Sequence, residues 1–280
     1  MFKKLKTFLF ISSLLAVFVP APCTFAASAS DTEALHTFID DENVIFSLTS
    51  IEEDDLFGYT WSVYLENKTD KNLMFSLEDV SVNDVMCDPF WAANVTAGNK
   101  SNESISWING FDEIGIEKVT KVEFRLKVYD DDDWSADPLT NDVHTYYPEG
   151  EDAFEEYVRE GQDTDTVLFD NDSASMTVIG FEPDDLFGYT VKTYLVNKTD
   201  KTLMFSSENA TVNGFMCDPF WATTVAPGKV SYSDITWGTS SFEENGITEV
   251  EKIELPITIY DYDDFMADNI VDETFTIEVQ

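Results

Sequence analysis

The chain has 280 residues, of which 43% are hydrophobic and 14% aromatic, so it has enough apolar side chains for packed cores and is not globally disordered. It carries 16 Lys and Arg residues against 55 Asp and Glu residues, a formal net charge of -39. Because neutralising phosphates takes many basic side chains, such a surface excludes nucleic acid and anionic lipid as binding partners.

The first 29 residues are organised as a secretory signal peptide. Three lysines, Lys3, Lys4 and Lys6, precede an apolar run over residues 8–19, and small residues follow up to Ala29. A run of about 12 residues is too short for a membrane span, which takes about 20. We therefore expect residues 1–29 to be removed and the mature protein to be secreted or extracellular, loosely associated with the cell surface at most.

A lipid-anchored protein and a membrane-spanning protein are the alternatives to simple secretion. A lipid anchor would use Cys23, but Pro20 and Pro22 stand where small or aliphatic residues are required. After the signal, no segment is apolar for long enough to form a membrane-spanning helix. The sequence therefore predicts no membrane span, and it favours release over lipid anchoring.

An internal duplication dominates the rest of the chain. Residues 52–107 align with residues 182–237 at a constant offset of 130, and 34 of the 56 positions are identical. After a one-residue insertion the alignment continues, with KVEFRLKVYDDDDW matching KIELPITIYDYDDF. Each copy is about 110 residues long, an ordinary size for one domain. We predict domains over residues 30–147 and 166–280, joined by an acidic linker over 148–165.

Apolar and polar residues alternate within each copy. One apolar series consists of Val122, Phe124, Leu126 and Val128, and the second copy repeats it as Ile253, Leu255, Ile257 and Ile259. A period of two is typical of strands with one buried face. Seven or eight short strands per copy, without an amphipathic helix, predict an all-β fold of two tandem β-sandwiches. Pro256 lies within a predicted strand, which indicates an edge position or a bulge.

The linker between the copies has two interpretations. Phe154, Tyr157 and Val158 are spaced as on one face of a helix, which would end near Gly161. A solvated linker without regular structure is the alternative.

The order of motifs in each copy resembles a known family. In the first copy, a strand begins at Gly58-Tyr59, the NKTDK turn starts at Asn67, and Val82-Asn83 precedes a V-x-x-G turn and an S-x-x-x-I strand. This order is similar to that of secreted immunoglobulin-like domains of Gram-positive exported proteins. Their fold resembles that of the mycobacterial immunoprotective secreted antigens. The resemblance covers both copies and implies an immunoglobulin-like fold, but it brings no catalytic residues.

The sequence contains no recognisable catalytic motif. The two histidines, His36 and His144, do not occupy equivalent positions in the two copies, and neither lies beside a nucleophile motif. No phosphate-binding Gly-rich loop or zinc-type cluster is present. We therefore predict a protein that is not an enzyme. A glycan hydrolase with paired carboxylates is the least favoured alternative.

Two cysteines, Cys87 and Cys217, occupy the same position in each copy. A bridge between them would require Cα atoms within about 7 Å, which equivalent positions of tandem domains rarely reach. We expect two buried thiols that pack as small hydrophobic side chains, with an interdomain disulfide as the alternative.

An acidic loop follows the long alternating strand in both copies and is the first candidate site. Its shared carboxylates are Asp130, Asp132, Asp133 and Asp137, which recur as Asp261, Asp263, Asp264 and Asp268. Calcium takes six to eight oxygen ligands, and closely spaced aspartates on one loop supply several of them. The pattern lacks the glycine and the terminal glutamate of an EF-hand loop. Calcium is therefore the candidate cofactor, and a solvated turn is the alternative.

The second candidate site is the MCDPFW segment. Phe90 and Trp91 follow a proline, and Phe220 and Trp221 repeat the pair in the second copy. Such a pair is either a stacking platform for a glycan or protein partner, or an aromatic plug of the sandwich end. Taken together, these features predict an exported binding or adhesion-type protein with an unknown protein or glycan partner. An envelope spacer without a specific ligand is the alternative.

Overall fold

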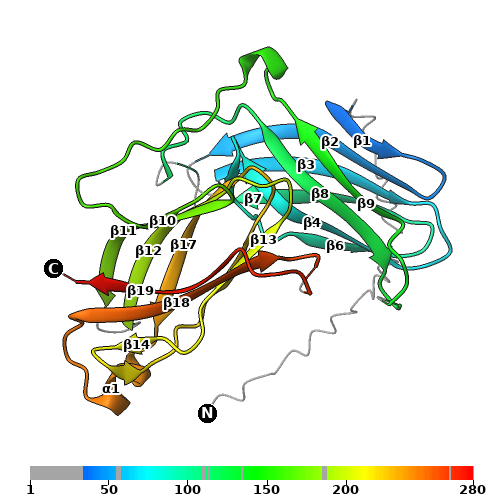
Figure 1. The fold of residues 1–280 in the computed structure, drawn as a ribbon. Helices are drawn as coiled ribbons and strands as arrows, with labels where there is room; N and C mark the ends of the chain where they lie inside the picture. Colours follow the sequence, from blue (N-terminus) through cyan, green and yellow to red (C-terminus); the bar gives the residue numbers. More distant parts are fainter. Residues whose placement is uncertain are drawn as a thin grey trace, which may run out of the picture. The chain divides into compact units, whose positions relative to one another are not determined.

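The structure, a computed structural model, describes residues 34–54, 58–108, 111, 114–133, 135–184, 188–264 and 266–279. Their regular secondary structure is almost entirely β-strand, so the expectation of an all-β chain built from several sheets is confirmed (Figure 1). The predicted signal peptide over residues 1–29 lies outside the described residues.

The first copy begins with a four-stranded antiparallel sheet. Its strand order is β1-β2-β3-β7, with bounds β1 (His36–Asp40), β2 (Val44–Asp54), β3 (Gly58–Asn67) and β7 (Lys100–Trp107). Along β3 half-buried and buried residues alternate at every position, as the period of two requires. One face of this sheet therefore supplies the core residues Trp61, Val63 and Leu65.

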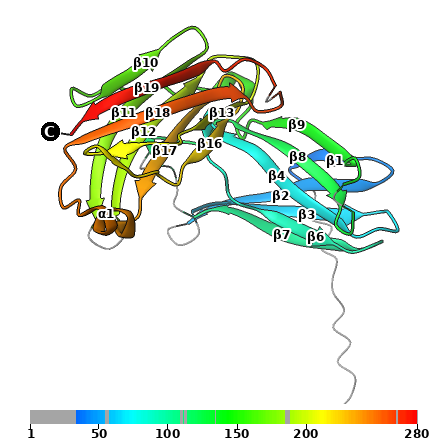
Figure 2. The same ribbon diagram turned by 60° about the horizontal axis from the view of Figure 1, so that its bottom comes forward.

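A second set of strands covers that buried face. The order is β5-β4-β8-β9, with β6 paired to β4, and the bounds are β4 (Leu73–Val82), β5 (Val85–Met86), β6 (Ala92–Val95), β8 (Val122–Asp130) and β9 (Thr140–Tyr146). In both views β8 and β9 lie side by side (Figure 2). The core of this copy packs large side chains from both sets of strands, among them Phe46, Trp61, Phe75 and Phe124.

The second copy repeats this arrangement, with the counterpart of β4 divided into two strands. Its elements are β10 (Thr166–Asp170), β11 (Ala174–Asp184), β12 (Gly188–Asn197), β13 (Leu203–Ser206), β14 (Thr211–Val212), β15 (Phe215–Met216), β16 (Ala222–Val225), β17 (Val230–Trp237), β18 (Lys252–Asp261) and β19 (Val271–Glu278). The register is the same down to the bulges, since His36 pairs with Leu48 where Thr166 pairs with Val178. A second core cluster lies in this copy.

Pro256 lies in a central strand and not at an edge. Its strand, β18, pairs with β19 on one side and with β13 and β14 on the other. Pro256 stands opposite the gap between β13 and β14, where its missing N–H leaves no ladder bond unmade. The first copy has Arg125 at this position, and there β4 runs unbroken past it. Of the two positions that the sequence indicated, an edge or a bulge, the edge is therefore wrong. The irregularity lies in the partner strand, which breaks opposite the proline.

The second copy contains a helix that the sequence pattern did not predict. The helix α1 (Thr239–Asn245) ends at Gly246, which has a left-handed φ of 67°. It lies beside the end of β12 (Figure 2). Its seven residues are too few to show a helical period, which explains why a strand pattern alone missed it.

The segment between the copies forms one 3-10 turn, η2 (Glu151–Ala153), and residues 154–163 have no regular structure. Its aromatic side chains contact both copies. Lys121 lies over the Phe154 ring at 5.1 Å, and the Tyr157 hydroxyl is hydrogen-bonded to that of Tyr232. Because this segment is not helical, Phe154 and Tyr157 do not form the helical face that their spacing indicated.

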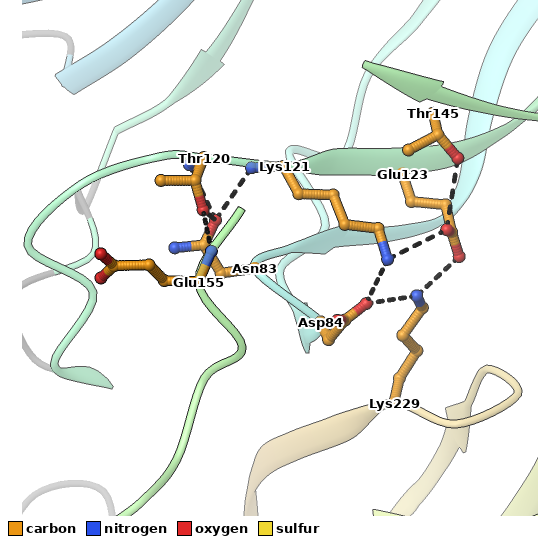
Figure 3. Close-up of polar contacts among 8 residues, drawn as sticks. All are labelled: Asn83, Asp84, Thr120, Lys121, Glu123, Thr145, Glu155 and Lys229. Atoms are coloured by element: carbon orange, nitrogen blue, oxygen red, sulfur yellow. Dashed lines mark hydrogen bonds and ion pairs between the residues drawn. The ribbon is translucent and has the colours of Figure 1, made fainter. Parts of the chain in front are cut away.

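The two copies also contact each other directly, at a surface that we call the seam. Val230 at the start of β17 pairs in parallel with Val85 of β5, and the Val230 amide donates to the Asp84 carbonyl at 3.0 Å. Beside this pairing the Lys229 ammonium lies 2.5 Å from a carboxylate oxygen of Asp84 and 2.7 Å from one of Glu123 (Figure 3). Lys121 completes the network, so two cations face two anions.

Candidate functional site

The acidic loop of the first copy is held together by its own hydrogen bonds. Asp130 is the last residue of β8 and is 7% exposed. It accepts from the Lys71 ammonium at 2.8 Å and from the Asp132 amide at 3.1 Å. The hydrogen bond from Lys71 lowers the pKa of the Asp130 carboxyl. Asp261 has the same pair of contacts, with Lys201 and the Asp263 amide, and its pKa is also lowered. These two carboxylates therefore close the turns of their loops.

The other carboxylates of the first loop point to separate donors. Asp132 accepts from the Asn72 side chain at 3.0 Å, and Asp133 accepts from the Ser135 hydroxyl at 2.7 Å. Asp137, Asp263, Asp264 and Asp268 are exposed. Within the part of the chain that the structure describes, no three His, Cys, Asp or Glu side chains are grouped as metal ligands. Calcium at these loops stays a prediction, and binding there would have to compete with Lys71 and Lys201.

The MCDPFW segment places its two aromatic residues in different environments. Trp221 is 8% exposed and donates from Nε1 to the Ser233 hydroxyl at 2.9 Å, and Trp91 packs against the first core, 6.1 Å from the Phe46 ring. Phe90 and Phe220 are 92% and 99% exposed. The two tryptophans therefore belong to the cores, and only the phenylalanines are presented to solvent.

Backbone geometry explains this separation in the first copy. Phe90 has a φ of 51°, in the left-handed region, and its amide donates to the Asp88 carboxylate at 2.7 Å. Left-handed backbone is uncommon for a bulky residue and persists only where the surroundings enforce it. Cys87, the residue before Asp88, is also held in place, because Trp107 Nε1 donates to its carbonyl at 2.7 Å. Trp237 makes the same hydrogen bond to the Cys217 carbonyl.

A groove of about 460 Å³ lies beside Phe220 in the second copy. Its other wall is the segment from Ser206 to Asn209, which connects β13 to β14. This is the strand break opposite Pro256, so the groove exists because the counterpart of β4 is interrupted here.

Neither cysteine forms a disulfide. Cys217 is 4% exposed and Cys87 is half-buried. Burial raises the pKa of the Cys87 thiol to about 11, and it raises that of Cys217 as well. Both thiols therefore stay protonated and unreactive at neutral pH.

A larger cleft, of about 1020 Å³, opens at the end of the second copy near α1. Its wall includes Phe181, Tyr189, Phe242 and Ile247. These residues were not apparent from the sequence, because Tyr189, Phe242 and Ile247 recur in the first copy and fit the pattern of ordinary core residues. The one signal is Phe181, which stands where the first copy has Ile51.

No protein-family model and no curated protein matches the chain. Among solved structures, the crystal structure of red sea bream transglutaminase is similar over 82% of this chain and 31% of that chain, at 10% sequence identity and a TM-score of 0.21. The chain thus spans about a third of that protein's length, and a similarity at this score supports no conclusion about fold or activity. No helix among the described residues is long and apolar enough to cross a membrane.

Proposed function

We propose that the chain is an exported, non-catalytic binding protein of the adhesion type. The observation that carries the proposal is the exposure of one phenylalanine at the equivalent position of each copy, 92% for Phe90 and 99% for Phe220. A bulky aromatic side chain is the residue type that contributes most to binding when a partner encloses it. An exposed phenylalanine recurs in both copies, while the tryptophan next to it packs against the core.

The turn geometry supports a role in recognition. The Asp88 carboxylate fixes the backbone of Phe90, so the ring is presented from a preformed turn. A preformed turn lowers the conformational entropy that is lost on binding. Carboxylates lie close to both rings in the sequence, Asp88 beside Phe90 and Asp218 beside Phe220. A partner that fits has an apolar recess with basic groups at its rim.

Duplication supports the same role. Two linked sites that bind a repetitive surface gain affinity from their effective concentration, without any new contact. We take each copy to be an immunoglobulin-like β-sandwich domain, over residues 30–147 and 166–280, as the resemblance of their motifs implies. Export by the segment 1–29 would place both sites outside the cell, where a protein or glycan surface is the partner.

Calcium has a secondary place in the proposal, as a ligand that stiffens the acidic loops. The support is the repetition of four aspartates in each copy, from Asp130 to Asp137 and from Asp261 to Asp268. The partner-binding role of the phenylalanines does not depend on it.

The proposal is tested on arrayed peptides and arrayed glycans, with the mature chain as the probe. We expect binding to peptides that combine apolar and basic residues, and loss of that binding in the variant with Phe90→Ala and Phe220→Ala. The matched control is Met266→Ser, which removes an equally exposed apolar side chain and introduces the residue found at the same position of the first copy, Ser135. Equal binding by all three proteins would contradict the proposal and favour a spacer without a specific ligand.

A further inference from the structure

The cleft near α1 has an aromatic wall. The Tyr189 ring lies 6.3 Å from the Phe181 ring and 6.3 Å from the Phe242 ring. Phe181 is 37% exposed, and Phe242 and Ile247 are half-buried, so these side chains border open space. Tyr189 is 7% exposed, and its hydroxyl has no hydrogen-bond partner among the described residues. A volume of about 1020 Å³ is at the upper end of the range of small-molecule sites.

The rim of the cleft is acidic. Its lining residues include six acids, Asp163, Asp165, Asp184, Glu243, Glu249 and Glu278, and no Lys, Arg or His is among the described residues that line it. One of the six, Asp165, is paired with Arg159 at 2.6 Å. The described lining of the cleft therefore supplies carboxylates and no basic side chain.

The first copy buries the corresponding side chains more fully. Phe111 and Ile116, which correspond to Phe242 and Ile247, are only 6% and 4% exposed. Ile114 packs against the core of the first copy, and its counterpart in the second copy is Asn245. The same apolar positions are thus enclosed in one copy and border a cleft in the other.

Two further differences change the chemistry of the cleft. Ile51 of the first copy is replaced by Phe181, which adds an aromatic ring to the wall. Lys118 is replaced by Glu249, which removes a cation and adds an anion at the rim. The backbone is the same at this point, because the Asn83 side chain donates to the Lys118 carbonyl as the Asn213 side chain does to the Glu249 carbonyl. Each difference favours an organic cation.

We propose that this cleft is a binding site for an organic ammonium compound with an apolar body. The apolar part would be removed from water against Phe181, Phe242 and Ile247, and the ammonium would lie between the aromatic faces and the carboxylates of Glu243 and Glu249. Aromatic faces attract cations, and nearby carboxylates offset the free-energy cost of desolvating the ammonium. The site is separate from the exposed phenylalanines and stands without the function proposed for them.

The experiment uses three probes of similar size that differ in charge. These are 4-phenylbutylamine, 4-phenylbutan-1-ol and 4-phenylbutyrate, titrated into the mature full-length chain by calorimetry and by ligand-detected NMR. We expect the amine to bind at least tenfold more tightly than the alcohol, and the carboxylate to show no binding.

Two variants replace cleft residues with those of the first copy, Glu249→Lys and Phe181→Ile. We expect each to weaken binding of the amine at least fivefold, and Glu249→Lys to leave binding of the alcohol unchanged. The control is Glu273→Lys, an exposed residue of β19 that does not line the cleft and gives the same change in net charge. Circular dichroism and thermal unfolding establish that each variant is folded.

The control distinguishes specific binding in the cleft from general electrostatic attraction of the amine to a chain of net charge -39. Equal affinities for the amine and the alcohol would overturn the proposal. So would equal loss of amine binding in Glu249→Lys and Glu273→Lys, or the absence of amine binding at millimolar concentration.

Discussion

The ammonium of Lys229 lies 2.5 Å from the carboxylate of Asp84, and the two residues belong to different copies of the repeat. Neither charge is present at the equivalent position of the other copy, which has Asn99 in place of Lys229 and Gly214 in place of Asp84. Both Asp84 and Gly214 have left-handed backbone, with φ of 69° and 84°, so the turn is the same and only the side chain was gained. The charged pair is therefore specific to the seam.

Exchanging these residues for those of the other copy tests the seam. We expect Lys229→Asn or Asp84→Gly to lower the free energy of unfolding by about 1–3 kcal/mol, because Lys229 is buried and its partners lose a charge-assisted hydrogen bond. The loss stays below that of an orphaned buried charge. In Lys229→Asn, Lys121 still faces both carboxylates, and in Asp84→Gly, Glu123 still faces Lys229. Urea unfolding gives the values.

The control for the seam is Lys100→Asn, which breaks an exposed ion pair with Glu66. Such pairs contribute about 0–1 kcal/mol. In the double variant of Lys229 and Asp84 the losses should not add, since both residues belong to one network. Additive losses, or losses equal to that of Lys100→Asn, would show that the seam contributes nothing specific.

His144 gives the stability a dependence on pH. It stacks on Phe124 at 5.7 Å, its Nε2 has no hydrogen-bond partner among the described residues, and burial lowers its pKa. The unfolded chain takes up this proton near pH 6.5, before the folded chain does. Stability is therefore complete above about pH 6.5 and is lost as the pH falls towards the lowered pKa.

His144→Phe should remove the part of the stability loss at low pH that protonation of this histidine causes. Unfolding free energies at pH 7.5 and pH 5.5 in the wild type and the variant give the comparison, with the exposed His36→Phe as control. If the wild type and His144→Phe lose the same stability between these values, the assignment to His144 is wrong.

Asn67 holds the NKTDK turn from inside the fold. It is 1% exposed, donates to the Lys71 and Val95 carbonyls at 2.7 and 2.8 Å, and accepts from the Thr69 amide at 2.9 Å. Asn67→Ala should cost about 1–3 kcal/mol because it leaves buried backbone groups without a partner. Asn197→Ala should cost a similar amount, since Asn197 has the same contacts. The exposed Asn102→Ala is the control, and a loss there as large as at Asn67 would contradict this account.

Calcium binding at the acidic loops requires a calcium-specific rise in thermal stability. Binding to the folded state alone stabilises it by about 2.7 kcal/mol when free calcium reaches roughly 100 times its Kd. We expect calcium, and not magnesium, to raise the unfolding midpoint, and the variant with Asp132→Asn and Asp263→Asn to abolish the rise. An unchanged midpoint, or an equal rise with magnesium, would show that these loops are solvated turns without a specific calcium site.

The sequence allows the strands to be predicted because their signal is local. The alternation from Val122 to Val128 is β8, and it needs no knowledge of the rest of the chain. Pro256 was misplaced because its environment depends on a break in a strand about 50 residues earlier, between β13 and β14. The pattern could not show that the partner strand would break where the proline lacks a donor.

Side-chain directions in the candidate sites were beyond the sequence for a similar reason. Phe90 and Trp91 are neighbours, and the backbone conformation of their turn, left-handed at Phe90, decides which ring faces the core. The local sequence around Asp130 suggests a metal ligand. Its actual partner, Lys71, lies in a turn 59 residues earlier in the chain. The cleft and the seam depend on differences between the copies, which a search for shared motifs passes over. These are Phe181 and Glu249 in the cleft and Lys229 and Asp84 in the seam.

The central claim is that Phe90 and Phe220 bind one surface together. The most direct test measures dissociation of the mature chain from an array-selected peptide immobilised at low and at high density. We expect the wild type to dissociate more than tenfold more slowly from the dense surface, and Phe90→Ala or Phe220→Ala alone to remove that difference. Identical dissociation of the wild type and both single variants at the two densities would contradict a bivalent role for the exposed phenylalanines.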